Sequence, residues 1–278
     1  NTQSNGTGTP YADKASVTNL TTSGTFTLYA QWEANTYTVT YNKNKPATSS
    51  NEVQGSTTSS GHTYDVSKAL TANGYTLTGW TFKGWNTNAN GTGTPYADKA
   101  SVTNLATSGT FTLYAQWEAN TYTVNYHANK PGGAKTDVVG TTASSTHTYD
   151  QAKNLTPNGY TLSGWTFLGW TTNSNGTGTS YTDGQLVTNL TTSGTFNLYA
   201  KWEANKNTTY IVEHYQMNVD GQGYTITDTD ELIGETDTIA TAVAKSYTGF
   251  TYNPNNENEV GSGNIAGDGS LVLRLYYD

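Results

Sequence analysis

The feature that most constrains the fold is an internal repeat of 85 residues. The motif Leu-Tyr-Ala-(Gln/Lys)-Trp-Glu-Ala-Asn occurs three times, with its tryptophan at Trp32, Trp117 and Trp202. This unit is longer than the ~20–50 residues of a stacked solenoid repeat, and it is long enough to bury a small core by itself. The repeat therefore predicts separate modules that follow one another along the chain like beads on a string.

The repeat alignment divides the chain into four segments. Asn5–Tyr11 repeats Asn90–Tyr96, so the first residues match the second half of a unit. The predicted segments are the C-terminal half of a truncated repeat (1–34), two repeat modules (35–119 and 120–204) and a distinct C-terminal module (205–278). Because the sequence starts mid-pattern and its single methionine is Met217, we expect it to be a piece of a longer protein.

Within a repeat, side-chain alternation predicts strands. Residues 122–126 alternate Tyr or Val with polar side chains, which is the period of a half-buried strand. Residues 196–202 alternate in the same way, and 165–170 form a more hydrophobic run. Asn175-Gly176 follows that run and predicts a tight turn.

One short helix is expected in each repeat. Asp65–Leu70 is the best candidate, since Asp65 can cap its start and Gly74 can end it. The counterpart in the second repeat begins at Asp150 and soon meets Pro157. Each repeat is thus predicted to hold about four or five strands and one helical turn. The fold class is mainly β (α+β) with little helix.

The C-terminal module gives similar signals. Tyr210–Tyr215 is rich in Tyr, Ile and Val and predicts a strand, and Asp220-Gly221 predicts a turn. Residues 271–277 place Leu and Tyr on one face of a closing strand. The stretch Thr238–Lys245 suits a helix by its Ala content and a strand by its Thr, Ile and Val.

Three segments of the repeat together carry a family resemblance. They are Tyr37–Tyr41, Gly79–Thr87 and Thr112–Trp117. In this order they resemble the Listeria–Bacteroides repeat, the internalin B-type B-repeat. The resemblance covers residues 1–204 and implies tandem β-grasp-like modules on a bacterial surface protein.

The C-terminal module carries a second resemblance. Tyr210–Tyr215 and Gly269–Tyr277 resemble parts of the MucBP-like modules of surface adhesins. This resemblance implies a β-grasp-like fold, extracellular placement and binding to mucin or other glycans. It gives no binding residues, so the ligand-binding residues stay unknown.

Composition and charge exclude several classes of function. Thirteen Lys and Arg stand against 21 Asp and Glu, a net charge of −8, whereas nucleic-acid binding rewards clustered Lys and Arg. Four His and no Cys exclude the usual zinc-finger and iron–sulfur ligand sets. No run of ~18 apolar residues is present to span a membrane. The 21 Tyr and 7 Trp argue against a disordered chain.

One pair of histidines is a candidate for catalysis. His62 and His147 occupy equivalent positions, three residues before Asp65 and Asp150. The alternative is that they are exposed loop histidines beside a helix cap, and this is the interpretation we adopt. No nucleophile elbow, P-loop or His-Glu-x-x-His motif is present. We expect no catalytic residues and no enzyme activity.

Two Asn-rich turns have the spacing of the start of a calcium loop. Asn86–Gly91 offers amides where carboxylates are needed, and the twelfth position is Ala97, with Asp98 out of register. A hairpin turn explains the Asn-Gly pair without an ion. The same holds for Asn218–Gly221, so no metal or other cofactor is expected.

Aromatic side chains are the one feature that could bind a ligand. The candidates for a glycan platform are Trp80, Trp85, Trp165, Trp170, Tyr276 and Tyr277. With so few aliphatic residues, however, Trp must supply much of the core, and we expect the tryptophans there. Better candidates for exposure lie on the opposite strand face, at Tyr29, Tyr114 and Tyr199.

Two further features have structural interpretations. Glu33, Glu118 and Glu203 recur where one unit meets the next, and we expect solvated charges there. A Lys–Asn isopeptide crosslink is a remaining possibility. It needs a Lys, an Asn and a carboxylate together in an apolar site, whereas most Lys residues lie in polar segments.

These observations predict a non-catalytic stalk and adhesion segment of a bacterial cell-surface protein, which spaces and presents a binding region. The alternative is a set of glycan- or mucin-binding modules, which a surface polysaccharide-degrading enzyme could carry as accessories. The expected partners are a host or environmental glycan, mucin or a surface protein. We expect an extracellular monomer, attached to the cell surface through regions outside this sequence.

Overall fold

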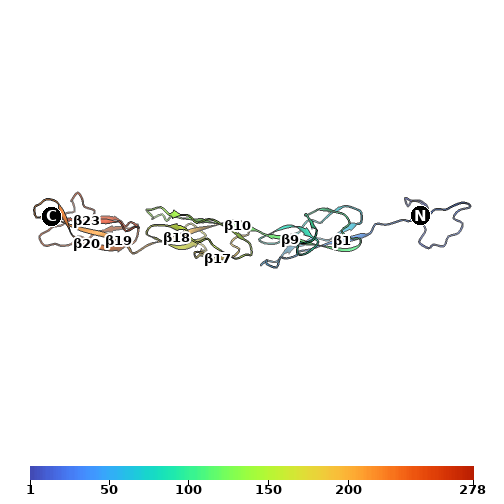
Figure 1. Ribbon diagram of the computed structural model, residues 1–278, viewed down its shortest axis with the longest axis horizontal. Coiled ribbons are helices and arrows are strands. Elements are labelled where there is room, and N and C mark those ends of the chain that lie inside the picture. Colours follow the sequence, from blue (N-terminus) through green and yellow to red (C-terminus); the bar gives the residue numbers. More distant parts are fainter. The chain divides into compact units, whose positions relative to one another are not determined.

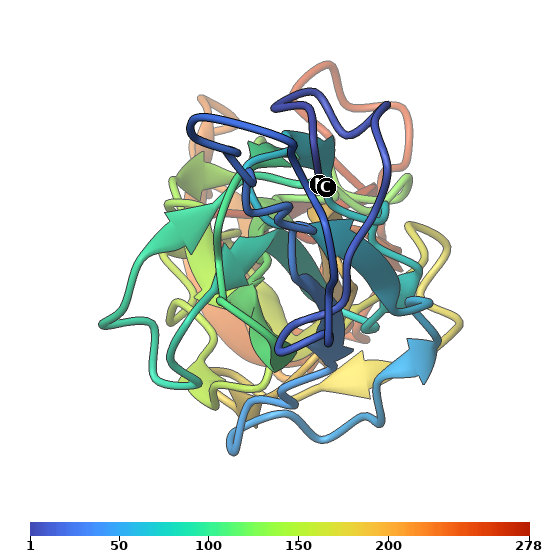
Figure 2. The ribbon, with the colours of Figure 1, turned by 90° about the vertical axis from the view of Figure 1, so that its right-hand side faces the viewer.

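The computed structural model describes all residues from Asn1 to Asp278. It contains strands and no helix, and no coiled ribbon is visible in either view of the chain (Figure 1, Figure 2). Two compact units are present, 1–118 and 119–278. The prediction of a mainly β chain is confirmed. The β-grasp-like description, which includes a helix, is not.

The first full repeat holds nine strands. Five of them form a mixed sheet in the order β3-β1-β9-β6-β7, and β2-β5 and β4-β8 form two-stranded ribbons. Their bounds are β1 (Thr36–Asn42), β2 (Gln54–Gly55), β3 (Ser60–Thr63), β4 (Lys68–Ala69), β5 (Tyr75–Thr76), β6 (Trp80–Asn86), β7 (Pro95–Tyr96), β8 (Ser101–Val102) and β9 (Gly109–Ala119).

The second repeat reproduces this arrangement. Its sheet has the order β12-β10-β18-β15-β16, with ribbons β11-β14 and β13-β17. The bounds are β10 (Thr121–His127), β11 (Val139–Gly140), β12 (Ser145–Thr148), β13 (Lys153–Asn154), β14 (Tyr160–Thr161), β15 (Trp165–Thr171), β16 (Ser180–Tyr181), β17 (Leu186–Val187) and β18 (Gly194–Ala204).

The first and last strands of each repeat run parallel, side by side. In the first repeat, β1 pairs with β9 from Tyr37↔Gly109 to Asn42↔Tyr114. In the second repeat, β10 pairs with β18 in the equivalent register. The alternation seen in the sequence sets the faces: Tyr and Val of β1 and β10 point into the core, and most of the Thr and Asn residues between them face outward.

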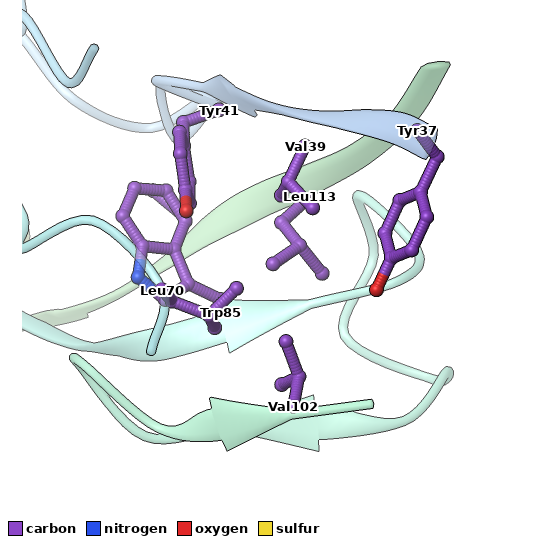
Figure 3. Close-up of a cluster of buried hydrophobic side chains, with 8 residues drawn as sticks. Tyr37, Val39, Tyr41, Leu70, Trp85, Val102 and Leu113 are labelled. Atoms are coloured by element: carbon purple, nitrogen blue, oxygen red, sulfur yellow. The ribbon is translucent and has the colours of Figure 1, made fainter. Parts of the chain in front are cut away.

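Each repeat has a core built from the same eight positions. In the first repeat Trp85 is buried between strands and packs against Tyr41, with ring centroids 4.8 Å apart (Figure 3). It also packs against Phe82, with ring centroids 4.9 Å apart. The first core consists of Tyr37, Val39, Tyr41, Leu70, Trp85, Val102, Leu113 and Ala115. The second core consists of Tyr122, Val124, Tyr126, Leu155, Trp170, Val187, Leu198 and Ala200. Every position recurs 85 residues later, so each repeat closes its own core.

The helix predicted at Asp65–Leu70 is wrong. Asp65 has a φ of +59°, whereas a residue that caps a helix takes a β-region conformation. Its backbone N–H donates to Asn104 Oδ1, and two residues of this segment form β4, which pairs with β8. The counterpart after Asp150 forms β13 and pairs with β17. Both segments are drawn into strand pairs by the second half of the repeat.

The C-terminal module contains five strands. The sheet β20-β19-β23 repeats the arrangement of β3-β1-β9, in which the first strand of the module lies between the other two. β19 and β23 run parallel, as β1 and β9 do. The bounds are β19 (Thr208–Met217), β20 (Tyr224–Gly234), β21 (Ile239–Thr241), β22 (Ser262–Asn264) and β23 (Val272–Tyr277). The ambiguous stretch Thr238–Lys245 therefore contains a short strand, β21, and no helix.

Residues 1–34 form no strand. Leu28 is 47% exposed and Trp32 is 92% exposed, whereas the equivalent Leu113 is fully buried. The segment holds the sequence of β9 without the strand that pairs with it in a full repeat. Its apolar side chains therefore lie at the surface.

Candidate functional site

The densest group of charged side chains lies in the C-terminal module, around Lys245. Its Nζ donates to Asp228 Oδ2 at 2.8 Å and to Asp230 Oδ1 at 2.6 Å, both on β20. The Tyr247 hydroxyl also donates to Asp228 Oδ2, at 3.1 Å. This lysine cluster is the candidate site, because no other place brings so many titratable groups together.

A fully buried histidine lies beneath the lysine cluster. His214, on β19, has its Nδ1 2.8 Å from the Tyr277 hydroxyl and its Nε2 3.2 Å from Asp230 Oδ2. The Lys245 backbone N–H donates to the same Tyr277 hydroxyl at 2.9 Å. The cluster thus ties the chain after β21 to all three strands of the sheet.

The electrostatics of the lysine cluster favour fixed charges. Hydrogen bonds from Lys245 lower the pKa of Asp228 and Asp230, and hydrogen bonds to these carboxylates raise the pKa of Lys245 above its ordinary value. Burial, together with the bond to Asp228, raises the pKa of Tyr247 to about 12. A general acid or base needs a pKa near the working pH, and these shifts all lead away from neutrality.

The lysine cluster also bears on the isopeptide hypothesis. A Lys–Asn crosslink forms when a neutral amine attacks the Asn amide and ammonia leaves, with a protonated carboxyl group assisting. The pKa shifts in the cluster favour the opposite states of the amine and the carboxyl. The ammonium groups of Lys68 and Lys153 donate instead to the backbone carbonyls of Gly61 and Thr146, each at 2.7 Å. These lysines act as structural hydrogen-bond donors.

His62 and His147 are not exposed, contrary to expectation. His62 on β3 is 2% exposed and His147 on β12 is 1% exposed. Each stacks on a core tyrosine, Tyr37 or Tyr122, with centroids 5.3 Å apart. The prediction of exposure was wrong because each histidine lies among Ser and Thr residues. Such a sequence gives no sign that β3 pairs with the core strand β1, or β12 with β10.

Burial determines the protonation of these histidines. Desolvation first, and the charge of Lys68 second, lower the pKa of His62. The pKa of His147 is lowered by burial and by Lys153 in the same way. The Nε2 atoms lie 2.9 Å from the Ser60 and Ser145 hydroxyls, and the Nδ1 atoms have no hydrogen-bond partner.

The aspartates considered as partners of these histidines are held elsewhere. Asp65 Oδ1 accepts a hydrogen bond from Asn104 Nδ2 at 2.7 Å, and Asp150 Oδ1 accepts one from Asn189 Nδ2 at 2.8 Å. The Oδ1 atoms of the same asparagines accept hydrogen bonds from the backbone N–H groups of the two aspartates, at 2.6 Å. Each aspartate is thus locked into a turn.

The calcium-like loops hold their polar atoms by internal hydrogen bonds. Asn86 Oδ1 accepts the backbone N–H groups of Asn88 and Gly93, and its Nδ2 donates to Gly91 O. In the second loop, Asp220 Oδ1 accepts the backbone N–H of Gln222 at 2.9 Å. Both loops are hairpin turns, as the Asn-Gly and Asp-Gly pairs predicted.

Most of the candidate aromatic platform is core. Trp85, Trp170 and Tyr277 are fully buried and Tyr276 nearly so. Trp80 and Trp165 are partly buried, at the start of β6 and β15. On the other strand face, Tyr29 is exposed, whereas Tyr114 and Tyr199 are only partly exposed.

The junction glutamates are exposed, as expected. Glu118 lies near the end of β9 and pairs with Lys83 at 2.9 Å, with both side chains more than half exposed. Glu203 occupies the equivalent exposed place in β18, and Glu33 is exposed in the first segment. A pair of this kind contributes little stability.

Three surface hollows lie beside aromatic side chains. The largest, about 660 Å³, is lined only by residues of segment 1–34. Another, about 490 Å³, lies in the first repeat beside Trp85 and Lys83. The smallest, about 280 Å³, lies in the second repeat beside Trp202 and is bordered by Lys130, Asn175 and Lys201. This last hollow, named here the Trp202 groove, is the one of the three that two lysines border.

Comparison with known proteins gives one result. The family model of the Listeria–Bacteroides repeat domain matches residues 37–116 and 122–201. No curated protein matches the chain. The two matched ranges contain both repeat cores, and the C-terminal module lies outside them. The structure contains no helix long and apolar enough to cross a membrane.

Proposed function

The chain belongs to the Listeria–Bacteroides repeat family, and from this membership we propose that it is a non-catalytic spacer segment of an extracellular bacterial surface protein. Repeats of this family occur in bacterial surface proteins. The observation that carries the proposal is the duplication itself: two repeats build the same sheet and the same eight-residue core. A repeated self-contained module adds length without adding a different site.

The polar groups of the modules bond to one another, and this supports the spacer proposal. The lysine cluster holds its charges in ion pairs, and burial lowers the pKa of His62 and His147. The Asn-rich turns satisfy their own amides. These groups stabilise the modules, so we propose that the segment has no enzyme activity and acts as a monomer.

A second candidate function is adhesion to a glycan, mucin or surface protein. The Trp202 groove supports it, because an indole beside amide and ammonium groups can stack on a sugar ring and bind its hydroxyls. The C-terminal module is the other candidate, by its likeness to MucBP-like modules. Such modules could also serve as accessories to a surface polysaccharide-degrading enzyme.

Binding of the full chain to mucin and to a glycan array distinguishes the two functions. The spacer proposal predicts no signal above that of an unrelated surface protein. Binding that is lost when Lys130 and Lys201 are both changed to Ala would support adhesion through the Trp202 groove. Binding that survives this double change would point to the C-terminal module. Either binding result contradicts a pure spacer.

A further inference from the structure

The second repeat and the C-terminal module meet at a Gly-Trp turn. The indole Nε1–H of Trp165 donates to Asp237 Oδ2 at 2.9 Å. The backbone N–H of Lys135, from another loop of the repeat, donates to the same oxygen at 3.2 Å. One carboxylate of the C-terminal module thus binds two separate donors of the repeat.

The backbones at this meeting point are too close for side chains. A Cβ on Gly164 would lie 2.4 Å from Gly267 Cα and 2.5 Å from Thr236 Cγ2. A Cβ on Gly267 would lie 2.2 Å from the Ser163 carbonyl oxygen. Gly164 also has a φ of +73°, which favours glycine. The two surfaces therefore fit only because both positions lack a side chain.

The residue that connects the two modules is held on both sides. The Asn205 backbone N–H donates to Gly164 O at 2.9 Å, and its carbonyl accepts the Thr236 N–H at 2.8 Å. The Thr166 hydroxyl donates to Asn205 Oδ1 at 2.6 Å. The connection is therefore bonded into both modules rather than free to swivel.

The loop that carries the aspartate is a regular part of these modules. Asp237 has a φ of +62°, and Asp65 and Asp150 have φ values of +59° and +60°. In each case the backbone N–H of the residue before the aspartate donates to the backbone carbonyl of an asparagine at the start of the module, at 2.8 Å. The three aspartates thus share both a left-handed backbone and the backbone bond that precedes it.

We propose that the Gly164–Trp165 turn and the Asp237 loop form a docking pair that fixes the orientation of the C-terminal module on the second repeat. The surface on the C-terminal module is the Asp237 carboxylate with Thr236 and Gly267, and its partner is a Gly-Trp turn. This docking is independent of the proposed function, since it holds whether the chain acts as a spacer or binds a ligand.

Distance measurement between two spin labels tests the docking pair in the full chain. The chain has no Cys, so Lys201→Cys in β18 and Glu231→Cys in β20, both exposed, label only these two sites. The parent should give one narrow distance distribution. Trp165→Phe removes the indole N–H and Gly267→Ala inserts a methyl group, and each should shift or broaden that distribution.

Two control variants make the same chemical changes away from the docking pair. Trp117→Phe removes an indole bond to Lys43 O within the first repeat, and Gly61→Ala adds a methyl group in the first repeat where nothing lies within 4 Å. Both should retain the parent distribution. The proposal is overturned if Trp165→Phe and Gly267→Ala also retain it, or if the controls broaden it equally. Thermal unfolding of each variant separates undocking from loss of fold.

Discussion

Ten residues other than glycine adopt a left-handed backbone conformation, and eight of them are Asn or Asp. Asn and Asp tolerate this conformation because their short side chains bond locally. The two exceptions are Lys14 and Lys99. The second repeat has Gly184 where the first has Lys99, with φ values of +62° and +59°. The first repeat therefore carries strain that the second avoids.

Lys99→Gly should stabilise the first repeat. Relief of a left-handed conformation gains ~1–2 kcal/mol, and the greater freedom of glycine in the unfolded chain costs ~0.4–1 kcal/mol. We expect a net gain of up to about 1.6 kcal/mol in the free energy of unfolding, measured by urea denaturation. The matched change Gly184→Lys should destabilise the second repeat, and a gain there would contradict the argument.

The buried histidines predict a pH dependence. The pKa values of His62 and His147 are lowered from 6.5 in the folded chain, so the unfolded chain binds protons more readily. The free energy of unfolding should be largest above about pH 6.5 and should fall as the pH drops through it. Changing His62 and His147 to Phe should flatten this fall between about pH 7.5 and 5.5. An unchanged slope in urea denaturation would show that other groups cause it.

Residue-scale expectations from the sequence succeeded where a residue's own chemistry decides the outcome. Asn-Gly predicted a turn because glycine at Gly176 takes a φ of +79°. The exposure of His62 could not be predicted in this way. It depends on the pairing of β3 with β1, which brings the imidazole against Tyr37.

At the scale of elements, the long strands follow from side-chain alternation and the short ones do not. β10 and β18 each bury every second residue along much of their length, so their sequences carried a clear period of two. The two-residue strands such as β4 and β13 have no period to detect. They exist because a partner strand from the second half of the repeat lies beside them. The local sequence does not reveal this partner strand, which is also why a helix was expected there.

The core position on the last strand provides a matched pair of variants. Leu198 in β18 is fully buried, whereas Leu28, at the same position of the repeat, is 47% exposed in segment 1–34. Leu198→Ala should lower the free energy of unfolding by about 2–5 kcal/mol through loss of burial and a cavity. Leu28→Ala should change it by less than about 0.5 kcal/mol. Equal losses in denaturant unfolding would contradict the described burial of this position.

At the scale of the whole molecule, the sequence repeat predicted the recurring cores, whereas the boundaries 1–34, 35–119, 120–204 and 205–278 stay a prediction. The likeness of the C-terminal module to the repeat sheet was missed, because their strand sequences differ. The one signal was Asn205, which follows Asn35 and Asn120 at the repeat spacing and makes the same backbone bond. The lysine cluster was also missed, since its members are far apart in sequence.

In the 278-residue chain, segment 1–34 should be the first part that a protease removes. It forms no strand, and Phe26, Tyr29 and Trp32 are exposed, which are the side chains that chymotrypsin cleaves after. Exposed segments without strand bonds open at little cost. Mass spectrometry of a short digestion should show first cuts before residue 35. First cuts within either repeat would contradict this order.

The parallel pairing of β1 with β9 has a mechanical consequence. When a module is pulled by its two ends, these strands are drawn in opposite directions along their length. Six residue pairs then bear the load together, instead of opening one after another. A module pulled through Cys at Thr36 and Glu118 should therefore rupture at a much higher force than one pulled through Cys at Thr36 and Thr110, where the bonds peel singly. Single-molecule force spectroscopy measures both, and similar forces would show that the parallel strands bear no special load. The C-terminal module pairs β19 with β23 in the same way, so the chain repeats one shear-loaded joint in three successive modules.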